Sequence, residues 1–384
     1  MDPQTKSCVC SPRTAHSNVA TNGTLEPMPD LLRVGIAGIR HSHTATLVRQ
    51  WREIPDVEIV AAADTFESAR TLAHDIWKIP AVYETWDELL EREQLDVVTS
   101  TLPNTQHAEV VEAVAGIGVP ILIEKPMAAS LEDTERMVRA VEAAGVLAMV
   151  NWPNLNELAI EAGQALINKG AIGRPHQFTF RGGNSIATRK ADQPDWFQWL
   201  FEANEGGGSW IDYAGYGATP CIMWMGTPKR MVARGSTMLD PDARADETAT
   251  AILEFDTGIG YMQTSHIQVG YAGPQGKMMH VEVNGDEGSL VLTPSQTDSK
   301  ASGTTSLMIY DNEGRIDGSL IPLEPRSPSH QSGVAYMAHA IRTKQPIEGR
   351  ASFRFNRDVV SVIDAGSRAI ASGAWVTVAP SMKD

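Results

Sequence analysis

A loop of unusual composition joins the first apolar segment of the chain to the first amphipathic one. Residues 35–43 read Gly-Ile-Ala-Gly-Ile-Arg-His-Ser-His, and a G-x-G-x-x-G pattern would begin at Gly38, with Arg40 and His43 at its second and third glycine positions. Where such a loop leads from a strand into a helix, free backbone N–H groups and the helix dipole favour an anion. The loop predicts a pyrophosphate site, although a glycine that merely permits a tight turn is the alternative. The residues expected to contact the pyrophosphate are Gly38, Ile39, Arg40 and His41.

An acidic residue ends the next apolar segment. Asp64 closes the run VEIVAAAD, and an acid at this place can accept hydrogen bonds from the ribose hydroxyls of a dinucleotide. It therefore favours NAD as the cofactor. NADP is the alternative, because Arg40 and Arg70 could pair with a 2'-phosphate. Without a ligand role, Asp64 would simply begin the turn before the next helix.

The segments that carry these residues alternate between apolar and amphipathic. Buried parallel strands are predicted at 31–39, 57–64, 96–102, 120–126 and 146–152. Helices are predicted at 42–54, 66–77, 84–94, 104–118 and 130–145. Ser130 caps the last of these helices, with Asp133 in the capping-box position. The alternation predicts a Rossmann domain over residues 31–153, built on a doubly wound parallel sheet.

The rest of the chain has a different pattern. After a helix at 157–170, strands are predicted at 175–182, 230–238, 247–269, 277–295 and 306–314. Turns of the types D-T-G and N-G-D-E-G indicate antiparallel hairpins. Helices at 330–344 and 357–373 are expected to cover one face of the resulting sheet. Residues 154–384 thus predict an α+β domain on a large, mainly antiparallel sheet, so that the fold class is α/β followed by α+β.

Three further motifs carry polar residues in a fixed order. The first is Thr101-Leu102-Pro103-Asn104 with His107, the second is Glu124-Lys125-Pro126, and the third runs from Gly206 through Asp212 to Tyr216. In this order and spacing the chain, from Leu31 to its C-terminus, resembles the Gfo/Idh/MocA family of oxidoreductases. Glu-Lys-Pro at the end of a strand, preceded by the Asn-x-x-His segment, is far more specific than a glycine loop.

The resemblance implies roles for the first two motifs. Glu124 would contact the nicotinamide ribose, and Lys125 would touch the reacting hydroxyl or carbonyl beside the cofactor. A lysine at the carboxyl end of a sheet can polarise a carbonyl or lower the pKa of an alcohol; a surface lysine beside a proline turn is the alternative. The residues implied to line or support the cofactor cleft are Thr101, Leu102, Pro103, Asn104 and His107.

The third motif departs from the family pattern. Asp212 matches the family's acid, but Tyr216 stands where histidine is usual, as it also does in glucose-fructose oxidoreductase. Residues 212 and 216 lie one helical turn apart and share a face. A phenol near the Lys125 ammonium can act as a general acid or base, because the ammonium stabilises phenolate. We therefore expect Lys125, Asp212 and Tyr216 to form the catalytic group.

Three functions fit these residues. The favoured one is hydride transfer between nicotinamide and a hydroxyl or carbonyl of a sugar, glycoside or polyol. Loss of the histidine and of two loop glycines would also fit a non-catalytic dinucleotide-binding sensor or scaffold. An NAD-dependent glycoside-cleaving enzyme that uses transient oxidation is the third.

The substrate is expected to be a small, sugar-like molecule. Aromatic faces pack on the C–H surfaces of sugars while polar groups bind hydroxyls. A metal site is not expected, since His266, His280, His330 and His339 are scattered. The candidate substrate-binding residues are Trp152, Asn154, Arg181 and Trp196.

Composition limits the class of partner. The 384 residues carry a formal net charge of -15 at pH 7, which argues against nucleic acid. No apolar run reaches the roughly 20 residues of a membrane span, so we expect a cytoplasmic protein with no membrane partner. Residues 1–30 are expected to be a disordered leader. Alternating apolar residues in KMMHVEVNG and TATAILEF predict a homodimer or homotetramer through the second sheet.

Overall fold

The first sheet of the computed structural model is a six-stranded parallel sheet. The structure describes residues 31–152, 157–239, 245–268, 278–294, 305–311, 318–323 and 325–382, so the predicted leader and Asn154 lie outside the described residues. The strand order is β3-β2-β1-β4-β5-β6, which confirms the doubly wound Rossmann prediction. The strands are β1 (Leu32–Ala37), β2 (Val57–Ala63), β3 (Ala81–Tyr83), β4 (Val97–Ser100), β5 (Ile121–Glu124) and β6 (Ala148–Asn151).

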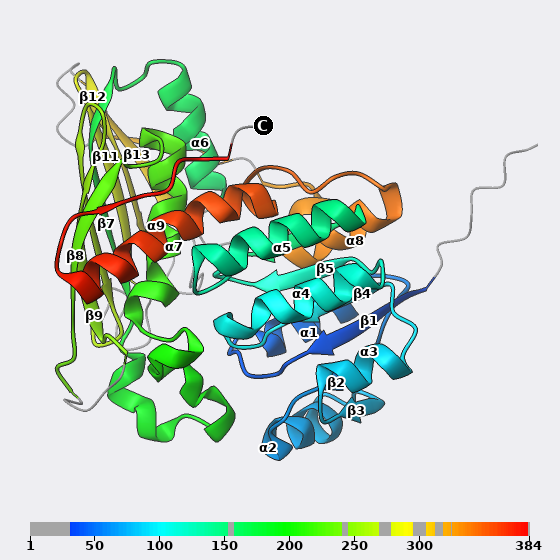
Figure 1. Cartoon of the computed structure of the whole chain (residues 1–384). Helices are drawn as coiled ribbons and strands as arrows, with labels where there is room; N and C mark the ends of the chain where they lie inside the picture. Colours follow the sequence, from blue (N-terminus) through cyan, green and yellow to red (C-terminus); the bar gives the residue numbers. More distant parts are fainter. Residues whose placement is uncertain are drawn as a thin grey trace, which may run out of the picture. The chain divides into compact units, whose positions relative to one another are not determined.

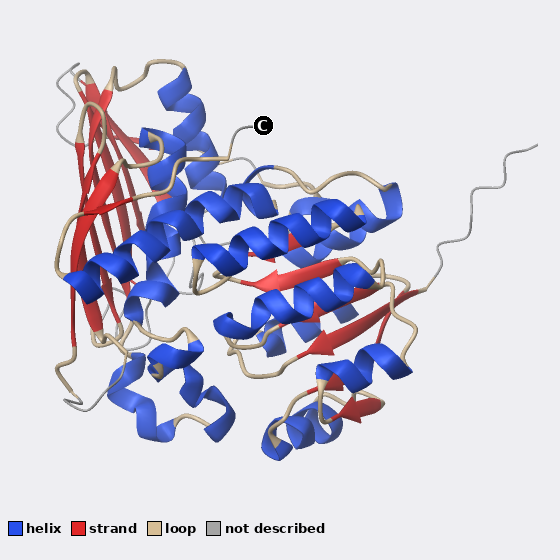
Figure 2. Cartoon of the chain, in the orientation of Figure 1, coloured by secondary structure: helices blue, strands red, loops and turns tan. Residues whose placement is uncertain are grey.

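Helices cover the first sheet, as Figures 1 and 2 show. Ser130 caps α5 by accepting from the Asp133 N–H, as its capping box predicts. The sequence pattern does not predict the edge strand β3, which has only three residues and no periodicity. Helix α2 continues as a π-helix over Leu72–Ile76, and α7 contains Pro220. The α-helices of the described residues, on both sheets, are α1 (Thr44–Arg52), α2 (Glu67–Thr71), α3 (Trp86–Arg92), α4 (His107–Gly116), α5 (Leu131–Ala144), α6 (Glu157–Asn168), α7 (Ser209–Met225), α8 (Gly333–Thr343) and α9 (Phe353–Ser372).

The second sheet has nine strands in the order β14-β13-β12-β11-β7-β10-β9-β8-β15. Only the β7–β10 pair is parallel among its described pairings, so the sheet is mainly antiparallel, as predicted. Phe178 and Phe180 of β7 and Met262 of β10 point into one buried core, against which α7 and α9 pack. The strands are β7 (Pro175–Gly183), β8 (Arg230–Ser236), β9 (Thr248–Glu254), β10 (Ile259–Ser265), β11 (Met278–Gly285), β12 (Gly288–Pro294), β13 (Thr305–Asp311), β14 (Ser319–Ile321) and β15 (Val376–Thr377).

One helix lies in an unexpected place. The prediction that residues 330–344 cover the second sheet is wrong, because α8 packs against α1 and β6 of the first sheet. Val334, Met337 and Ala338 share a core there with strand residues such as Val34. The apolar face of α8 was visible in the sequence, but nothing in it says which of two apolar sheets receives that face.

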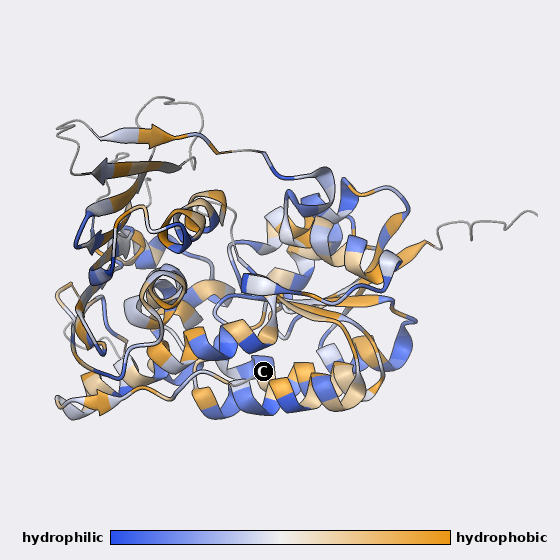
Figure 3. Cartoon of the chain, turned by 90° about the horizontal axis from the view of Figure 1, so that it is seen from above, coloured by the Kyte–Doolittle hydropathy of each residue, from blue (hydrophilic) through white to orange (hydrophobic). Residues whose placement is uncertain are grey.

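Hydropathy follows this packing. In Figure 3 hydrophilic and hydrophobic residues alternate along the helices, as expected for helices that bury one side and expose the other. Of the helices in the described ranges, none has the length and apolar character needed to cross a membrane.

Candidate active site

The loop between β1 and α1 is shaped around Gly38. This residue has a φ of 85°, and a Cβ there would lie 2.7 Å from the Leu102 side chain and 2.8 Å from the Leu102 backbone nitrogen. The Thr101 hydroxyl donates to the Gly38 carbonyl oxygen at 2.6 Å. A positive φ in so tight a space requires glycine. The turn that the sequence predicted therefore exists, and Thr101 and Leu102 hold it.

The loop offers unpaired backbone donors. Within the described part of the chain, the backbone N–H groups of Arg40, His41 and Ser42 have no hydrogen-bond partner. They lie at the carboxyl end of β1, directly before α1. Free N–H groups ahead of a helix suit a phosphate, so the loop fits the pyrophosphate of a dinucleotide.

Asp64 braces the same loop. Its carboxylate accepts from the backbone N–H of Ile39 at 2.7 Å and from that of Phe66 at 2.9 Å. Burial raises the pKa of Asp64, although these two hydrogen bonds oppose the rise. Arg70 donates to the Asp64 backbone carbonyl oxygen at 2.7 Å rather than to its carboxylate. The ribose contact of Asp64 stays a prediction.

Arg40 joins the loop to a segment far along the chain. Its guanidinium donates to Glu205 at 2.8 Å and to the Trp196 carbonyl oxygen at 3.3 Å, and it lies over the Phe66 ring. The indole of Trp199 donates to the Arg40 carbonyl oxygen at 2.5 Å. Arg40 is therefore already paired with a carboxylate, and Trp196 lies beside the cofactor loop.

The first motif ties loops together. The Asn104 amide donates to the Gly206 carbonyl oxygen at 2.8 Å. The ring nitrogens of His107 lie 3.0 Å from the carbonyl oxygens of Met127 and Leu102, and burial lowers the pKa of this histidine. Pro103 precedes the short 3₁₀ helix Asn104–Gln106. These contacts hold the neighbouring loops together, and a role of this motif at the cofactor stays a prediction.

Glu124 ends β5 in a cluster of donors. Its side chain is 1% exposed, contacts His43 Nδ1 at 3.1 Å, and accepts from the Asn151 amide. Burial would raise the pKa of Glu124, but His43, His41 and Asn151 together lower it to about 2. The carboxylate is ionised, as an acceptor for ribose hydroxyls requires.

Together with His41 and His43, the Glu124 carboxylate forms a group that could bind a metal ion. One ligand atom from each histidine and one from Glu124 lie within 4.8 Å of one another. Burial, followed by the neighbouring His43, lowers the pKa of His41 well below its usual value, which keeps a neutral imidazole. The three side chains could hold a metal ion, but Glu124 could not then also serve a ribose. The sequence analysis named other histidines and expected no metal site, because the meeting of His41 and His43 with Glu124 depends on the fold of the loop after β1.

Lys125 forms an ion pair with a carboxylate of α7. Its Nζ contacts Asp212 Oδ1, and the two side chains are 4% and 13% exposed. The other oxygen of Asp212 lies 2.9 Å from His266 Nε2. Burial would raise the pKa of Asp212, but Lys125 and the hydrogen bond with His266 lower it well below its usual value.

Asp212 is placed by the first turn of α7. Asp246 accepts from the Trp210 N–H at 2.9 Å and from the Ser209 hydroxyl at 2.6 Å. A carboxylate at a helix N-terminus satisfies backbone donors and complements the helix dipole. Gly208, with a φ of 110°, leads the chain into this turn.

Tyr216 joins Lys125 and Asp212, as the i,i+4 spacing predicted. Lys125 Nζ lies 5.1 Å from the centre of its ring. Burial, and then the charges of Asp212 and Glu124, raise the pKa of Tyr216 well above its usual value. The expectation that the ammonium stabilises a phenolate is therefore not met: in this surrounding the phenol stays protonated and can act as a hydrogen-bond donor.

The candidate substrate-binding residues do not lie together in the structure. Trp152 packs edge-on against Tyr216 with ring centres 5.3 Å apart, and its indole N–H donates to Asn356. Arg181 does not join the site, because strand alternation places it opposite Phe178 and Phe180, where it donates to Gln263. Of the candidates in the described ranges, Trp152 is thus the one whose ring contacts Tyr216.

Three polar residues were missed as members of the site. His43 and Asn151 both contact Glu124, and His266 contacts Asp212. His43 and Asn151 stand at the carboxyl edge of the first sheet, where strand order could have suggested them. No sequence signal marks His266, because its partner is 54 residues away on another element.

Comparisons with known proteins agree with this arrangement. Residues 32–152 match the family model described as an oxidoreductase family with an NAD-binding Rossmann fold, and residues 160–291 match the GFO/IDH/MocA C-terminal domain. The chain is 26% identical over 324 residues to D-xylose 1-dehydrogenase (NADP(+)) 2 of Haloferax volcanii, across 83% of this chain and 91% of that protein. It is 29% identical over 269 residues to D-apiose dehydrogenase of Paraburkholderia graminis, across 68% of this chain and 66% of that protein.

A solved structure is similar over nearly the whole chain. Aldose-aldose oxidoreductase from Caulobacter crescentus, complexed with glycerol, superposes with a TM-score of 0.70 at 19% identity, covering 90% of this chain and 99% of that one. Fold and matched models together define an oxidoreductase with an NAD-binding Rossmann domain. The chain belongs to the Gfo/Idh/MocA family.

Proposed function

We propose that the protein is an NAD(P)-dependent dehydrogenase of sugars or polyols. The observation that carries this proposal is the placement of Lys125, which directly follows Glu124 at the carboxyl edge of the first sheet and pairs with Asp212 of α7. The ammonium of Lys125 therefore lies beside the predicted cofactor site and contacts α7, the helix that carries Asp212 and Tyr216. NAD is the preferred cofactor on the strength of Asp64, and NADP is the alternative.

The chain's residues divide the work as follows. The loop at Gly38 would hold the pyrophosphate, Asp64 and Glu124 would bind the two riboses, and the bound nicotinamide would supply the acceptor or donor of hydride. Lys125 hydrogen-bonds the reacting oxygen, stabilises the negative charge that develops on it and exchanges the proton: its ammonium gives a proton when a carbonyl is reduced, and its neutral amine takes that proton when an alcohol is oxidised. Asp212 keeps Lys125 in place. Tyr216 holds its proton and can donate to the same oxygen.

The names of the relatives support the substrate class. Those proteins act, by name, on D-xylose and D-apiose, and they are dehydrogenases. They favour a dehydrogenase over the sensor and the glycoside-cleaving alternative. Trp152 beside Tyr216 offers an aromatic surface of the kind that sugars pack on.

The test is a substrate screen read by NADH absorbance. The chain would be assayed with NAD+ and NADP+ against D-xylose, D-apiose, D-glucose and myo-inositol, with Lys125→Met as the inactive reference. We expect turnover of at least one of these compounds and none by the variant. Binding of either dinucleotide without turnover of any sugar or polyol would contradict the proposal and favour a sensor, and release of an aglycone without net NADH would indicate glycoside cleavage.

We also propose a homodimer or homotetramer formed through the second sheet. The face of this sheet opposite α7 carries Ile252, Tyr261 and Leu320, which are 41%, 37% and 62% exposed. Ile252 and Tyr261 are cross-strand neighbours, so together they form a small exposed apolar patch. Light scattering of the wild type should report a multiple of the 41.6 kDa chain mass, and the Ile252→Lys variant should have a lower mass. A monomeric mass for the wild type and for the variant would contradict the assembly.

We also propose a cytoplasmic location, which cell fractionation would test.

A further inference from the structure

His266 completes a row of three buried side chains. Its Nε2 lies 2.9 Å from Asp212 Oδ2, while Oδ1 of the same carboxylate pairs with Lys125. The side chains of His266 and Asp212 are 2% and 13% exposed. Both oxygens of one carboxylate are therefore used, one on each side.

The backbone fixes His266 directly after β10. Its N–H donates to the Glu247 carbonyl oxygen at 2.7 Å, and its own carbonyl oxygen accepts from the Ala187 N–H at 2.9 Å. The ring stands edge-on to Phe201 and Tyr213, with centres 6.5 and 5.9 Å away. Held at the backbone and on two sides of the ring, the imidazole has little room to turn away from Asp212.

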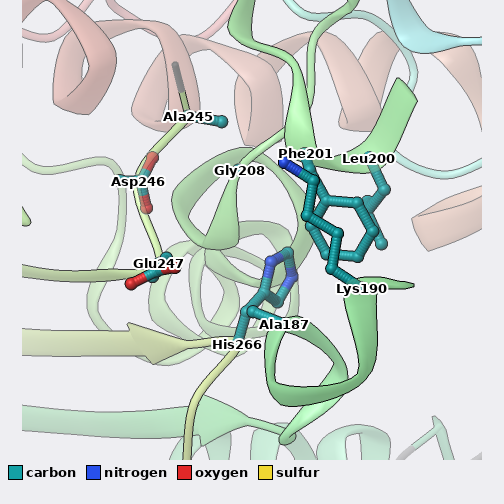
Figure 4. Close-up of a pocket in the computed structure, with 9 residues that line it drawn as sticks. All are labelled: Ala187, Lys190, Leu200, Phe201, Gly208, Ala245, Asp246, Glu247 and His266. Atoms are coloured by element: carbon teal, nitrogen blue, oxygen red, sulfur yellow. The ribbon is translucent and has the colours of Figure 1, made fainter. Parts of the chain in front are cut away.

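Other charged and titratable groups surround His266. Tyr213 approaches from α7, and Lys190, Asp246 and Glu247 line a small cavity together with His266 (Figure 4). Both acids have other partners. Asp246 caps α7, and Glu247 accepts from the backbone N–H groups of Met238 and Leu239 at 2.5 and 2.7 Å. Asp212 is therefore the carboxylate with which the imidazole pairs.

We propose that His266 is a positioning residue for the reaction: from β10 it holds the Asp212 carboxylate in the orientation that keeps Lys125 directed at the reacting oxygen. This role rests on the proposed dehydrogenase function. It gives the site an imidazole although position 216 carries tyrosine. In this role His266 acts through Asp212, with which its ring nitrogen pairs.

Substitution at position 266 separates this role from general packing. His266→Ala removes the donor to Oδ2, so we expect kcat to fall about 10- to 100-fold with KM changed less than about threefold. Losing the donor also raises the pKa of Asp212, so the acid limb of the kcat profile should move to higher pH. The amide of His266→Gln reaches the place of Nε2 and should restore much of the rate, whereas the shorter His266→Asn should not.

A matched control uses a second histidine beside a carboxylate. His74, whose side chain is 65% exposed, lies 2.7 Å from Asp75 in the π-helical turn Leu72–Ile76, and His74→Gln should leave kcat, KM and the pH profile unchanged. Wild-type kinetics and an unmoved acid limb in His266→Ala would overturn the proposal. Equal rescue by the Asn and Gln variants would overturn it as well, because the position of the donor would then be irrelevant.

A second readout needs no turnover. In the full chain labelled with ¹⁵N-histidine, the Nε2–H signal of His266, assigned by its absence in His266→Gln, should shift or vanish in Asp212→Asn. An unchanged signal would show that the two groups are not coupled and would overturn the proposal. A wild-type chain that turns over no sugar overturns the dehydrogenase function, whereas an active chain whose rate ignores position 266 overturns only the role of His266.

Discussion

The two halves of the site are built in different ways. The proposed cofactor half is assembled from residues at the carboxyl ends of neighbouring parallel strands: Gly38 after β1, Asp64 after β2 and Glu124 at the end of β5. The proposed substrate half joins Lys125, Asp212 and His266, which come from three distant elements. Parallel strands bring their ends to one edge by construction, whereas the second group depends on how α7 and β10 pack.

This difference predicts how each half responds to substitution. Residues of the cofactor half act mainly through backbone shape and a fixed carboxylate, so changing them should alter dinucleotide binding. Residues of the substrate half act through charge and proton position, so changing them should alter turnover while binding is kept.

The largest expected effect is on turnover. Lys125→Met removes the ammonium that faces the reacting oxygen and should lower kcat about 1,000-fold or more, within the range of lost charge stabilisation and acid–base help. The rate with the best substrate of the screen would be compared with that of Lys169→Met, an exposed lysine after α6. A loss of less than tenfold would contradict the assigned role of Lys125.

The next effect is on cofactor binding. Gly38→Ala places a Cβ 2.8 Å from the Leu102 backbone nitrogen at a φ of 85°, so the loop must shift, and NADH affinity should fall about 100-fold, roughly 3 kcal/mol. Gly118→Ala is the matched control, because Gly118 also has a positive φ but no atom within 4 Å of the added Cβ. Calorimetric titration would show whether only Gly38→Ala weakens binding; equal affinities would refute the importance of the tight turn.

Acid stability tests the buried carboxylate of the cofactor half. The pKa of Glu124 is lowered from 4.5 to about 2, so the stability that it contributes is present above pH 4.5 and is lost as the pH falls toward 2. Between pH 6 and pH 3 this loss amounts to roughly 2 kcal/mol. Urea unfolding of Glu124→Gln should therefore show a smaller drop over that interval than the wild type or the surface variant Glu109→Gln. Identical drops in all three chains would mean that Glu124 is not held ionised in this way.

The smallest expected effect concerns Tyr216. Tyr216→Phe removes one hydroxyl and keeps the ring against Trp152, so kcat should fall about tenfold, or roughly 1.4 kcal/mol. Since the pKa of Tyr216 is raised well above its usual value, the wild type should show no basic limb from this residue below about pH 10. Steady-state rates from pH 6 to pH 9.5 would check both points, with Tyr83→Phe on β3 as the control. An unchanged rate would remove Tyr216 from proton transfer.

Much of the cofactor half could be predicted from sequence. The alternation of apolar and amphipathic segments located all strands of the first sheet except β3. Gly38 and Asp64 were predicted from their places at strand ends, whereas the role of Glu124 was implied by the family resemblance of the Glu-Lys-Pro motif. Local spacing also brought Asp212 and Tyr216 together, since four residues make about one helical turn. These are short-range rules, and the structure keeps them.

Long-range packing limited the rest. His266 could not be predicted as a partner of Asp212, because the contact depends on how β10 enters the second sheet. Arg181 was expected to bind substrate, but the alternation of β7 directs it to the face opposite Phe178 and Phe180, and the sequence does not show which face of the second sheet carries the site. The covering role of α8 was misassigned for a similar reason, as an amphipathic helix does not specify which sheet it covers.

The division between the two halves can be measured directly by titrating NADH into Gly38→Ala and Lys125→Met side by side with the wild type. We predict that Lys125→Met binds NADH within about fivefold of the wild type, whereas Gly38→Ala binds it at least tenfold more weakly, differences of about 1 and 1.4 kcal/mol or more. The reverse order, or equal weakening in both variants, would show that the residues do not divide into a binding half and a reacting half.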